Sequence, residues 1–160
     1  MAGMFSGPLK NQLIPERVCQ GIPSFLERGD TKVKKQPFVT KEKLDEITVT
    51  YTTPFHLYDE KGIRENARAV KEAFAWNKGF REYYAVKANA NPFLINILKE
   101  YGCGVDCSSM TELMLSDALG FSGEEIMFSS NDTPAEEFVF ADKIGATINL
   151  DDFTHIEFLE

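Results

Sequence analysis

Residues 80–107 read FREYYAVKANANPFLINILKEYGCGVDC, and this stretch decides the fold class. Its first part, 80–87, is typical of a short apolar strand. Asn91 and Pro92 then open a helix, because asparagine accepts hydrogen bonds from free amides and proline fits the first helical turn. Gly102 ends that helix, and 104–107 is a second strand-like segment. The order strand, capped helix, glycine, strand predicts a parallel βαβ unit.

The same unit recurs roughly every twenty residues toward the end of the chain. Two further helices are predicted to stop at Gly120 and Gly145, and each is followed by a strand, at 126–128 and 147–150. Two capping-box patterns, in which a Ser or Thr is followed three residues later by Glu, predict where these helices begin. The patterns are Ser109–Glu112 and Thr133–Glu136.

Upstream of residue 80 the pattern is less regular. Residues 40–46 predict a short helix, and the alternating run 47–51 and the segment 53–58 are typical of short strands. An amphipathic helix is predicted from Asp59 to about Trp76. We therefore expect two regions: an irregular N-terminal arm at 1–40, where glycines and prolines are too closely spaced for a long helix, and a domain at 41–160.

Two parallel α/β architectures fit these elements, an open doubly wound sheet and a closed (β/α)8 barrel. The turn after the first strand lacks the glycines of a dinucleotide-binding loop. Polar side chains instead follow the strands at their carboxyl ends, the active face of such barrels. These residues are Lys87, Asp106, Ser108, Ser129–Asn131, Asn149 and Asp151. The sequence thus favours a TIM-type barrel of which only about the first half is present, so that the chain is a fragment or completes itself with a partner.

Lys87 is the side chain that points to chemistry. We expect it at the end of a buried strand, where an unpaired ammonium is costly and desolvation favours the neutral amine that attacks carbonyls. Asp106, on the next strand, is as well explained by a turn or a helix cap as by a role beside a cofactor. His56 and His155 are isolated, and we predict packing or surface roles for them.

Composition excludes several classes of function. The net charge of −8 over 160 residues argues against nucleic acid and anionic membranes as partners. No apolar run is long enough to span a bilayer. Three cysteines without an export signal predict reduced thiols and a cytoplasmic location. Cys103 and Cys107 lack further ligands nearby, so we expect small buried thiols and no metal site.

From Thr53 to the end, the chain resembles the N-terminal part of the diaminopimelate decarboxylase family, pyridoxal-phosphate enzymes with an alanine-racemase-type barrel. The resemblance covers about two thirds of the chain. Its motifs are Thr53-Pro54-Phe55-His56-Leu57-Tyr58-Asp59, Tyr84-Ala85-Val86-Lys87-Ala88-Asn89, Gly104-Val105-Asp106-Cys107-Ser108-Ser109 with Glu112, Phe128-Ser129-Ser130-Asn131 and Ile148-Asn149-Leu150-Asp151-Asp152.

The resemblance implies that Lys87 forms a Schiff base with pyridoxal 5'-phosphate and that Asp106 has an electrostatic role near the cofactor. It implies a lyase of lysine biosynthesis that converts the amino acid meso-diaminopimelate to L-lysine and CO2, and a homodimer for the full-length family protein. The family's cofactor-stacking histidine, glycine-rich phosphate loop, pyridine-pairing glutamate and C-terminal β domain have no match in these 160 residues. We therefore expect the chain alone to be inactive.

Two other functions stay open at this point. The chain can be a non-catalytic module that binds pyridoxal phosphate or a partner. It can also belong to a related decarboxylase that acts on ornithine, arginine or carboxynorspermidine. The residues that would choose among these substrates are not identifiable in the sequence.

Overall fold

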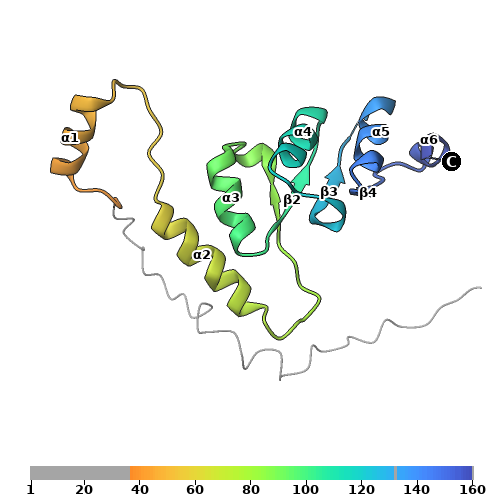
Figure 1. The fold of residues 1–160 in the computed structure, drawn as a ribbon, viewed down its shortest axis with the longest axis horizontal. Coiled ribbons are helices and arrows are strands. Elements are labelled where there is room, and N and C mark those ends of the chain that lie inside the picture. The colour runs from red at the N-terminus through yellow and green to blue at the C-terminus, as the bar shows by residue number, and fades with distance from the viewer. Residues whose placement is uncertain (1–36, 132, 160) are drawn as a thin grey trace, which may run out of the picture. The chain divides into compact units, whose positions relative to one another are not determined.

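The computed structural model describes residues 37–131 and 133–159, so most of the predicted arm at 1–40, including Cys19, lies outside the described residues. The described part alternates helices and strands (Figure 1). Its α-helices are α1 (Lys41–Thr50), α2 (Glu60–Ala73), α3 (Pro92–Glu100), α4 (Met110–Ala118), α5 (Ala135–Lys143) and α6 (Ile156–Leu159). Its strands are β1 (Tyr83–Ala85), β2 (Gly104–Cys107), β3 (Ile126–Ser129) and β4 (Thr147–Asn149).

The four strands form one parallel sheet in the order β1-β2-β3-β4. Three pairs fix the register: Ala85 lies opposite Asp106, Asp106 opposite Met127, and Ser129 opposite Asn149. Neighbours in the sheet are thus neighbours in the chain, joined by helical crossovers as parallel strands require. The predicted α/β class and parallel sheet are confirmed.

The hydrophobic core lies between the sheet and one layer of helices. From the strands it takes alternate residues, including Val105, Cys107 and Phe128, as the two-residue period of a strand requires. The helices α3, α4 and α5 contribute the facing side chains, which are Ile95, Leu113, Phe138 and Ala141. The intervening strand residues, Asp106 among them, therefore face the other side of the sheet, away from this core.

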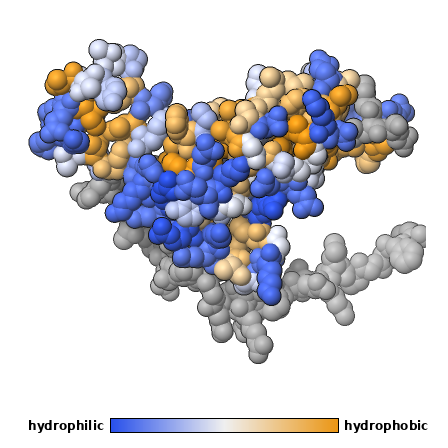
Figure 2. Space-filling model, in the orientation of Figure 1, coloured by the Kyte–Doolittle hydropathy of each residue, from blue (hydrophilic) through white to orange (hydrophobic). Residues whose placement is uncertain are grey.

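Apolar side chains also reach the outer surface of these helices (Figure 2). Met114 on α4 is 55% exposed and Val139 on α5 is 69% exposed. Isolated exposed apolar residues are common on folded proteins, so neither residue by itself marks a binding site.

The predicted helix ends agree closely with the structure. Gly102, Gly120 and Gly145 have φ angles of 82°, 75° and 73°, a left-handed conformation that other residues adopt only at a cost. Each glycine follows a helix and precedes the next strand, so all three lie at the edge of the sheet where the strands begin.

Four upstream and capping predictions are wrong. The run 47–51 is not a strand, because α1 continues through it to Thr50. The segment 53–58 pairs with no strand of the described residues. Ser109 makes no side-chain bond to a helix amide, and α5 begins after Pro134 without a side-chain cap, so neither predicted capping box forms.

A capping box does form elsewhere, at Ser122 and Glu125, around the 3-10 turn Gly123–Glu125. Within the described residues, none of the helices combines the length and the apolar character that a bilayer span demands.

Candidate functional site

Lys87 does not lie in a strand. β1 ends at Ala85, and a 3-10 turn, Val86–Ala88, carries the lysine. Val86 is fully buried and anchors the turn, whereas Lys87 is exposed. The expectation of a buried lysine is therefore wrong for this structure, because the chain leaves the sheet two residues before it.

Asp106 lies beside that turn, in β2 and in register with Ala85. Its side chain is half-buried, and its Oδ1 atom is buried without a hydrogen-bond partner in the described part of the chain. A buried carboxylate oxygen with no donor is costly, so such atoms are rare unless a ligand or water supplies the donor. Asp106 thus has a buried oxygen on this face for which the described residues supply no partner.

The loop after Asp106 is held by two glutamates. Glu112 Oε2 accepts a hydrogen bond from the amide of Ser108 at 2.8 Å, and Glu137 Oε1 accepts one from the amide of Met110 at 3.0 Å. These bonds satisfy free amides near the start of α4, although the predicted capping box would have bonded the amides of Ser109 and Glu112 instead. The two glutamates therefore fix the chain immediately after Asp106.

The remaining predicted polar positions follow β3 and β4. Ser129, the last residue of β3, lies opposite Asn149, the last residue of β4. Ser129 is half-buried and Asn149 is exposed. Ser130 is buried, and its Oγ atom donates to the carbonyl of Asn131 at 3.4 Å. The parallel sheet thus brings the carboxyl ends of all four strands to one edge, as predicted, with Lys87 in the turn after β1 and Asp106 in the adjacent strand β2.

Sequence reasoning missed a cluster of hydroxyl and amide groups around the lysine turn. Asn89 Nδ2 donates to the hydroxyl of Tyr58 at 3.1 Å, and the Tyr84 hydroxyl donates to the Asn89 carbonyl at 3.3 Å. Burial, and to a lesser extent the nearby Tyr58, raises the pKa of Tyr84. Tyr58 belongs to a quoted motif, but only the structure shows that it reaches Asn89.

The thiols have structural surroundings. Cys107 is fully buried, and its Sγ atom lies 3.2 Å from Ser116 Oγ. Burial raises the pKa of Cys107 to about 11, which keeps the thiol protonated at neutral pH. No group of three or more metal-ligating side chains occurs in the part of the chain that the structure describes.

His155 packs edge-on against Phe138, with ring centroids 5.5 Å apart, as a packing role predicts.

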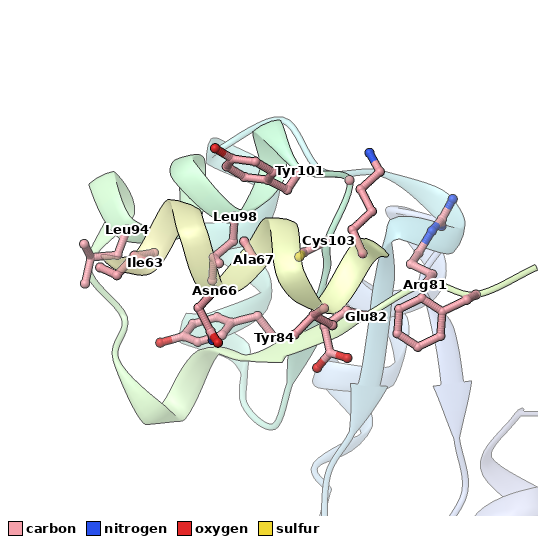
Figure 3. Close-up of a pocket in the computed structure, with 14 residues that line it drawn as sticks. Ile63, Asn66, Ala67, Arg81, Glu82, Tyr84, Leu94, Leu98, Tyr101 and Cys103 are labelled. Atoms are coloured by element: carbon pink, nitrogen blue, oxygen red, sulfur yellow. The ribbon is translucent and has the colours of Figure 1, made fainter. Parts of the chain in front are cut away.

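A cavity of about 600 Å³ lies between α2, α3 and β1 (Figure 3). Its lining includes Ala67, Tyr84, Leu98 and Cys103, but neither Lys87 nor Asp106. Tyr84 packs against the hydrophobic core, so the cavity is on the helix-covered side of the sheet. The cavity and the lysine edge are therefore separate features.

Comparison with known proteins gives consistent results. A family model described as "Pyridoxal-dependent decarboxylase, pyridoxal binding domain" matches residues 60–160. The chain is 46% identical over 114 residues to protein TabA of Pseudomonas amygdali pv. tabaci, covering 71% of this chain and 27% of that protein. It is 36% identical over 107 residues to diaminopimelate decarboxylase of Methanothermobacter thermautotrophicus, covering 66% of this chain and 25% of that protein.

The fold is also similar to a solved structure. The crystal structure of diaminopimelate decarboxylase from M. jannaschii matches with a TM-score of 0.67 and 28% identity, covering 71% of this chain and 28% of that one. The likeness confirms the predicted first half of a parallel barrel. The chain spans about a quarter of the length of the curated relatives it matches.

Proposed function

Since the chain belongs to the family of pyridoxal-dependent decarboxylases through its pyridoxal binding domain, we propose that Lys87 and Asp106 form the cofactor side of its active site. The observation that carries the proposal is that the turn bearing Lys87 follows β1 directly, while Asp106 on the adjacent strand β2 lies in register with Ala85, the last residue of β1. Lys87 is exposed, and Asp106 offers a buried carboxylate oxygen for which the described residues supply no donor.

Both residues fit pyridoxal 5'-phosphate. Among the described residues Lys87 makes no ion pair within 4.0 Å, so its amine is available to bind the cofactor's aldehyde. The unpartnered oxygen of Asp106 can accept a hydrogen bond from the bound group or stabilise positive charge near it. When bound, the cofactor supplies the electron sink that allows an amino acid to lose its carboxylate as CO2.

The chain's own residues supply position and charge. The turn Val86–Ala88 presents the Lys87 amine at the edge of the sheet, and the buried side chain of Val86 keeps that turn in place. Glu112 and Glu137 hold the loop that follows Asp106, which restricts where its carboxylate can lie. A fixed charge beside the reacting group stabilises charge that develops there without a reorganisation cost.

For the substrate we propose meso-diaminopimelate, which would yield L-lysine and CO2. The support is the identity of 36% to a diaminopimelate decarboxylase and the TM-score of 0.67 to another. Ornithine, arginine and carboxynorspermidine remain alternatives. Protein TabA, which has a higher identity of 46%, carries no substrate in its name and leaves this choice open.

A second candidate function is a cofactor-binding module without turnover. It is favoured by the family model, which describes a pyridoxal binding domain, because binding the cofactor does not by itself require the further groups with which a decarboxylase holds its substrate. The homodimer, the cytoplasmic location and the division of the chain at residue 40 stay predictions.

Addition of pyridoxal 5'-phosphate to the full chain tests these proposals. We expect a new absorbance band, and borohydride reduction followed by peptide mass spectrometry should place the label on Lys87. Lys87→Arg should abolish the band and the label, whereas Lys78→Arg, at an exposed loop position, should change neither. CO2 release from meso-diaminopimelate supports the enzyme, and a band without release supports the module. A folded chain that is not labelled at Lys87 contradicts both.

A further inference from the structure

Asn89 uses every hydrogen-bonding group that it has. Its amide donates to the carbonyl of Val86 at 3.1 Å, and its carbonyl accepts from the Tyr84 hydroxyl at 3.3 Å. Its side-chain Oδ1 accepts from the amide of Asn91 at 3.1 Å, and its Nδ2 donates to the Tyr58 hydroxyl at 3.1 Å. One half-buried residue thus ties together β1, the start of α3 and the 53–58 segment.

The first of these bonds closes the turn that carries Lys87. Lys87 is the central residue of Val86–Ala88, so the bond from Asn89 to Val86 fixes the backbone on both sides of it. The direction of a Cα–Cβ bond follows from the backbone dihedrals. The hydrogen bonds that hold Asn89 therefore help to set the direction in which the lysine side chain leaves the turn.

The side chain of Asn89 is the part of this arrangement that can be removed without breaking the turn. Its Oδ1 fixes the distance from the turn to α3, and its Nδ2 fixes the distance to Tyr58. The 53–58 segment forms no strand, and this contact holds it against Asn89, the residue that follows the lysine turn. Tyr58 in turn stacks on His56, with ring centroids 6.2 Å apart.

We infer that Asn89 is a positioning residue for Lys87 and that Tyr58 is the anchor through which the 53–58 segment supports it. The inference rests on the proposed cofactor role of Lys87. Asn89 touches neither cofactor nor substrate in this role. It acts by keeping the lysine turn in the conformation from which the amine reaches the aldehyde, and loss of its side-chain bonds slows that reaction by widening the range of lysine positions.

Four variants of the full chain separate positioning from general stability. Asn89→Ala removes both side-chain bonds and leaves the backbone bonds. Asn89→Asp keeps the acceptor for Asn91, and its second oxygen can accept from the Tyr58 hydroxyl. Tyr58→Phe removes one hydroxyl. The fourth variant, Asn96→Ala, is the matched control, because Asn96 is an exposed asparagine on the neighbouring helix α3.

The measurement is the rate at which pyridoxal 5'-phosphate with borohydride labels Lys87, divided by the rate at Lys78 in the same sample. We expect Asn89→Ala to lower this ratio about tenfold, the effect of losing roughly two ordinary hydrogen bonds. Tyr58→Phe should lower it about threefold, and Asn89→Asp should restore it to near the unmodified chain. The double variant Asn89→Ala with Tyr58→Phe should be no slower than Asn89→Ala alone, because both remove the same contact.

The possible outcomes are distinct. If Lys87 of the unmodified chain is not labelled, the proposed function is wrong and the inference falls with it. If Lys87 is labelled but the Asn89→Ala ratio matches that of Asn96→Ala, the inference alone is wrong. Should Asn89→Ala fail to fold, Tyr58→Phe decides: an unchanged ratio overturns the inference, and a threefold loss supports it.

Discussion

Cys107 shows how strongly this core controls a single group. The thiol has no exposed surface, and the thiolate would have to give up water for one weak partner, the hydroxyl of Ser116. Burial therefore raises its pKa from the ordinary 9.0 to about 11, and the bond to Ser116 offsets only part of this. A protonated thiol is a poor nucleophile, so Cys107 is a packing residue.

The raised pKa predicts a loss of stability in alkali. The folded chain holds the Cys107 proton more tightly than the unfolded chain, so this contribution is complete below pH 9.0 and is lost as the pH rises toward 11. The full difference is worth roughly 2 to 3 kcal/mol. The Cys107→Ser variant has no thiol to titrate at this position. Between pH 8.5 and 10.5 its free energy of unfolding should therefore fall by about 2 kcal/mol less than that of the unmodified chain. Urea unfolding of both proteins at the two pH values, in the presence of a reductant, measures this difference. Equal losses of unfolding free energy in the variant and the unmodified chain would contradict the prediction.

At the site, the sequence predicts Lys87 as the cofactor lysine, which stays a prediction, but it does not predict the surroundings of the lysine. The motif around Lys87 points to this residue, and the parallel register brings it to the same edge as Asp106. Its exposure was not predictable, because an apolar run does not show where a strand ends. The unpartnered oxygen of Asp106 and the contact of Asn89 with Tyr58 depend on segments distant in sequence, so no local pattern reveals them.

At the scale of elements, two helices with similar start signals begin in different ways. The side chain of Asn91 accepts from the amide of Phe93 at 3.0 Å and caps α3. Ser109 at the start of α4 bonds instead to the Thr111 hydroxyl at 3.1 Å. A capping side chain stabilises a helix only when it accepts from one of the free amides.

Alanine substitution at these two positions should therefore give unequal effects. Asn91→Ala should lower the free energy of unfolding by about 1 kcal/mol, the usual value of a cap. Ser109→Ala should change it by less than about 0.5 kcal/mol, as for an ordinary surface substitution. Thermal or urea unfolding of both variants checks the difference, and a larger loss for Ser109→Ala would show that the predicted capping box forms in solution.

The contact between β1 and β2 depends on a residue without a side chain. A Cβ atom added to Gly104 would lie 2.6 Å from the carbonyl oxygen of Glu125 and 2.8 Å from the ring of Tyr83. A backbone oxygen in a turn cannot move freely, so Gly104→Ala should destabilise the chain by about 1 to 3 kcal/mol. Gly79→Ala is the control, since a Cβ atom there would lie 3.6 Å from Asn77 Oδ1, an ordinary van der Waals distance. Equal urea midpoints for the two variants would contradict the prediction.

Elements with regular signals were predictable, and elements that depend on a distant partner were not. The glycines after α3, α4 and α5 set the helix ends because only they adopt the left-handed conformation cheaply. The run 47–51 has the alternation of a strand, yet no breaker separates it from the helix before it. The segment 53–58 has strand-like residues but no neighbouring strand to pair with, and pairing is a tertiary property.

At the scale of the whole molecule, the described residues are packed unevenly. Ala67 on α2 lines the 600 Å³ cavity, whereas Ala141 on α5 lies fully buried in the core cluster. Enlarging a side chain stabilises a protein where space is available and strains it where none is. The same substitution at the two alanines should therefore have opposite signs.

Ala67→Leu should raise the free energy of unfolding by about 0.5 to 2 kcal/mol, because the added carbons enter the cavity. Ala141→Leu should lower it by about 1 to 3 kcal/mol, because the core has no room for them. Urea unfolding of both variants measures the sign of each change in the free energy of unfolding. A loss of stability in Ala67→Leu would mean that the cavity between α2, α3 and β1 is closed in solution.

The three left-handed glycines lie where the strands begin, and Lys87 lies where β1 has ended. Mutations that disturb chain reversal and mutations at the proposed cofactor lysine therefore fall on opposite rims of the sheet. The proposed chemistry can thus be tested by substitutions that leave the helix-ending turns unchanged.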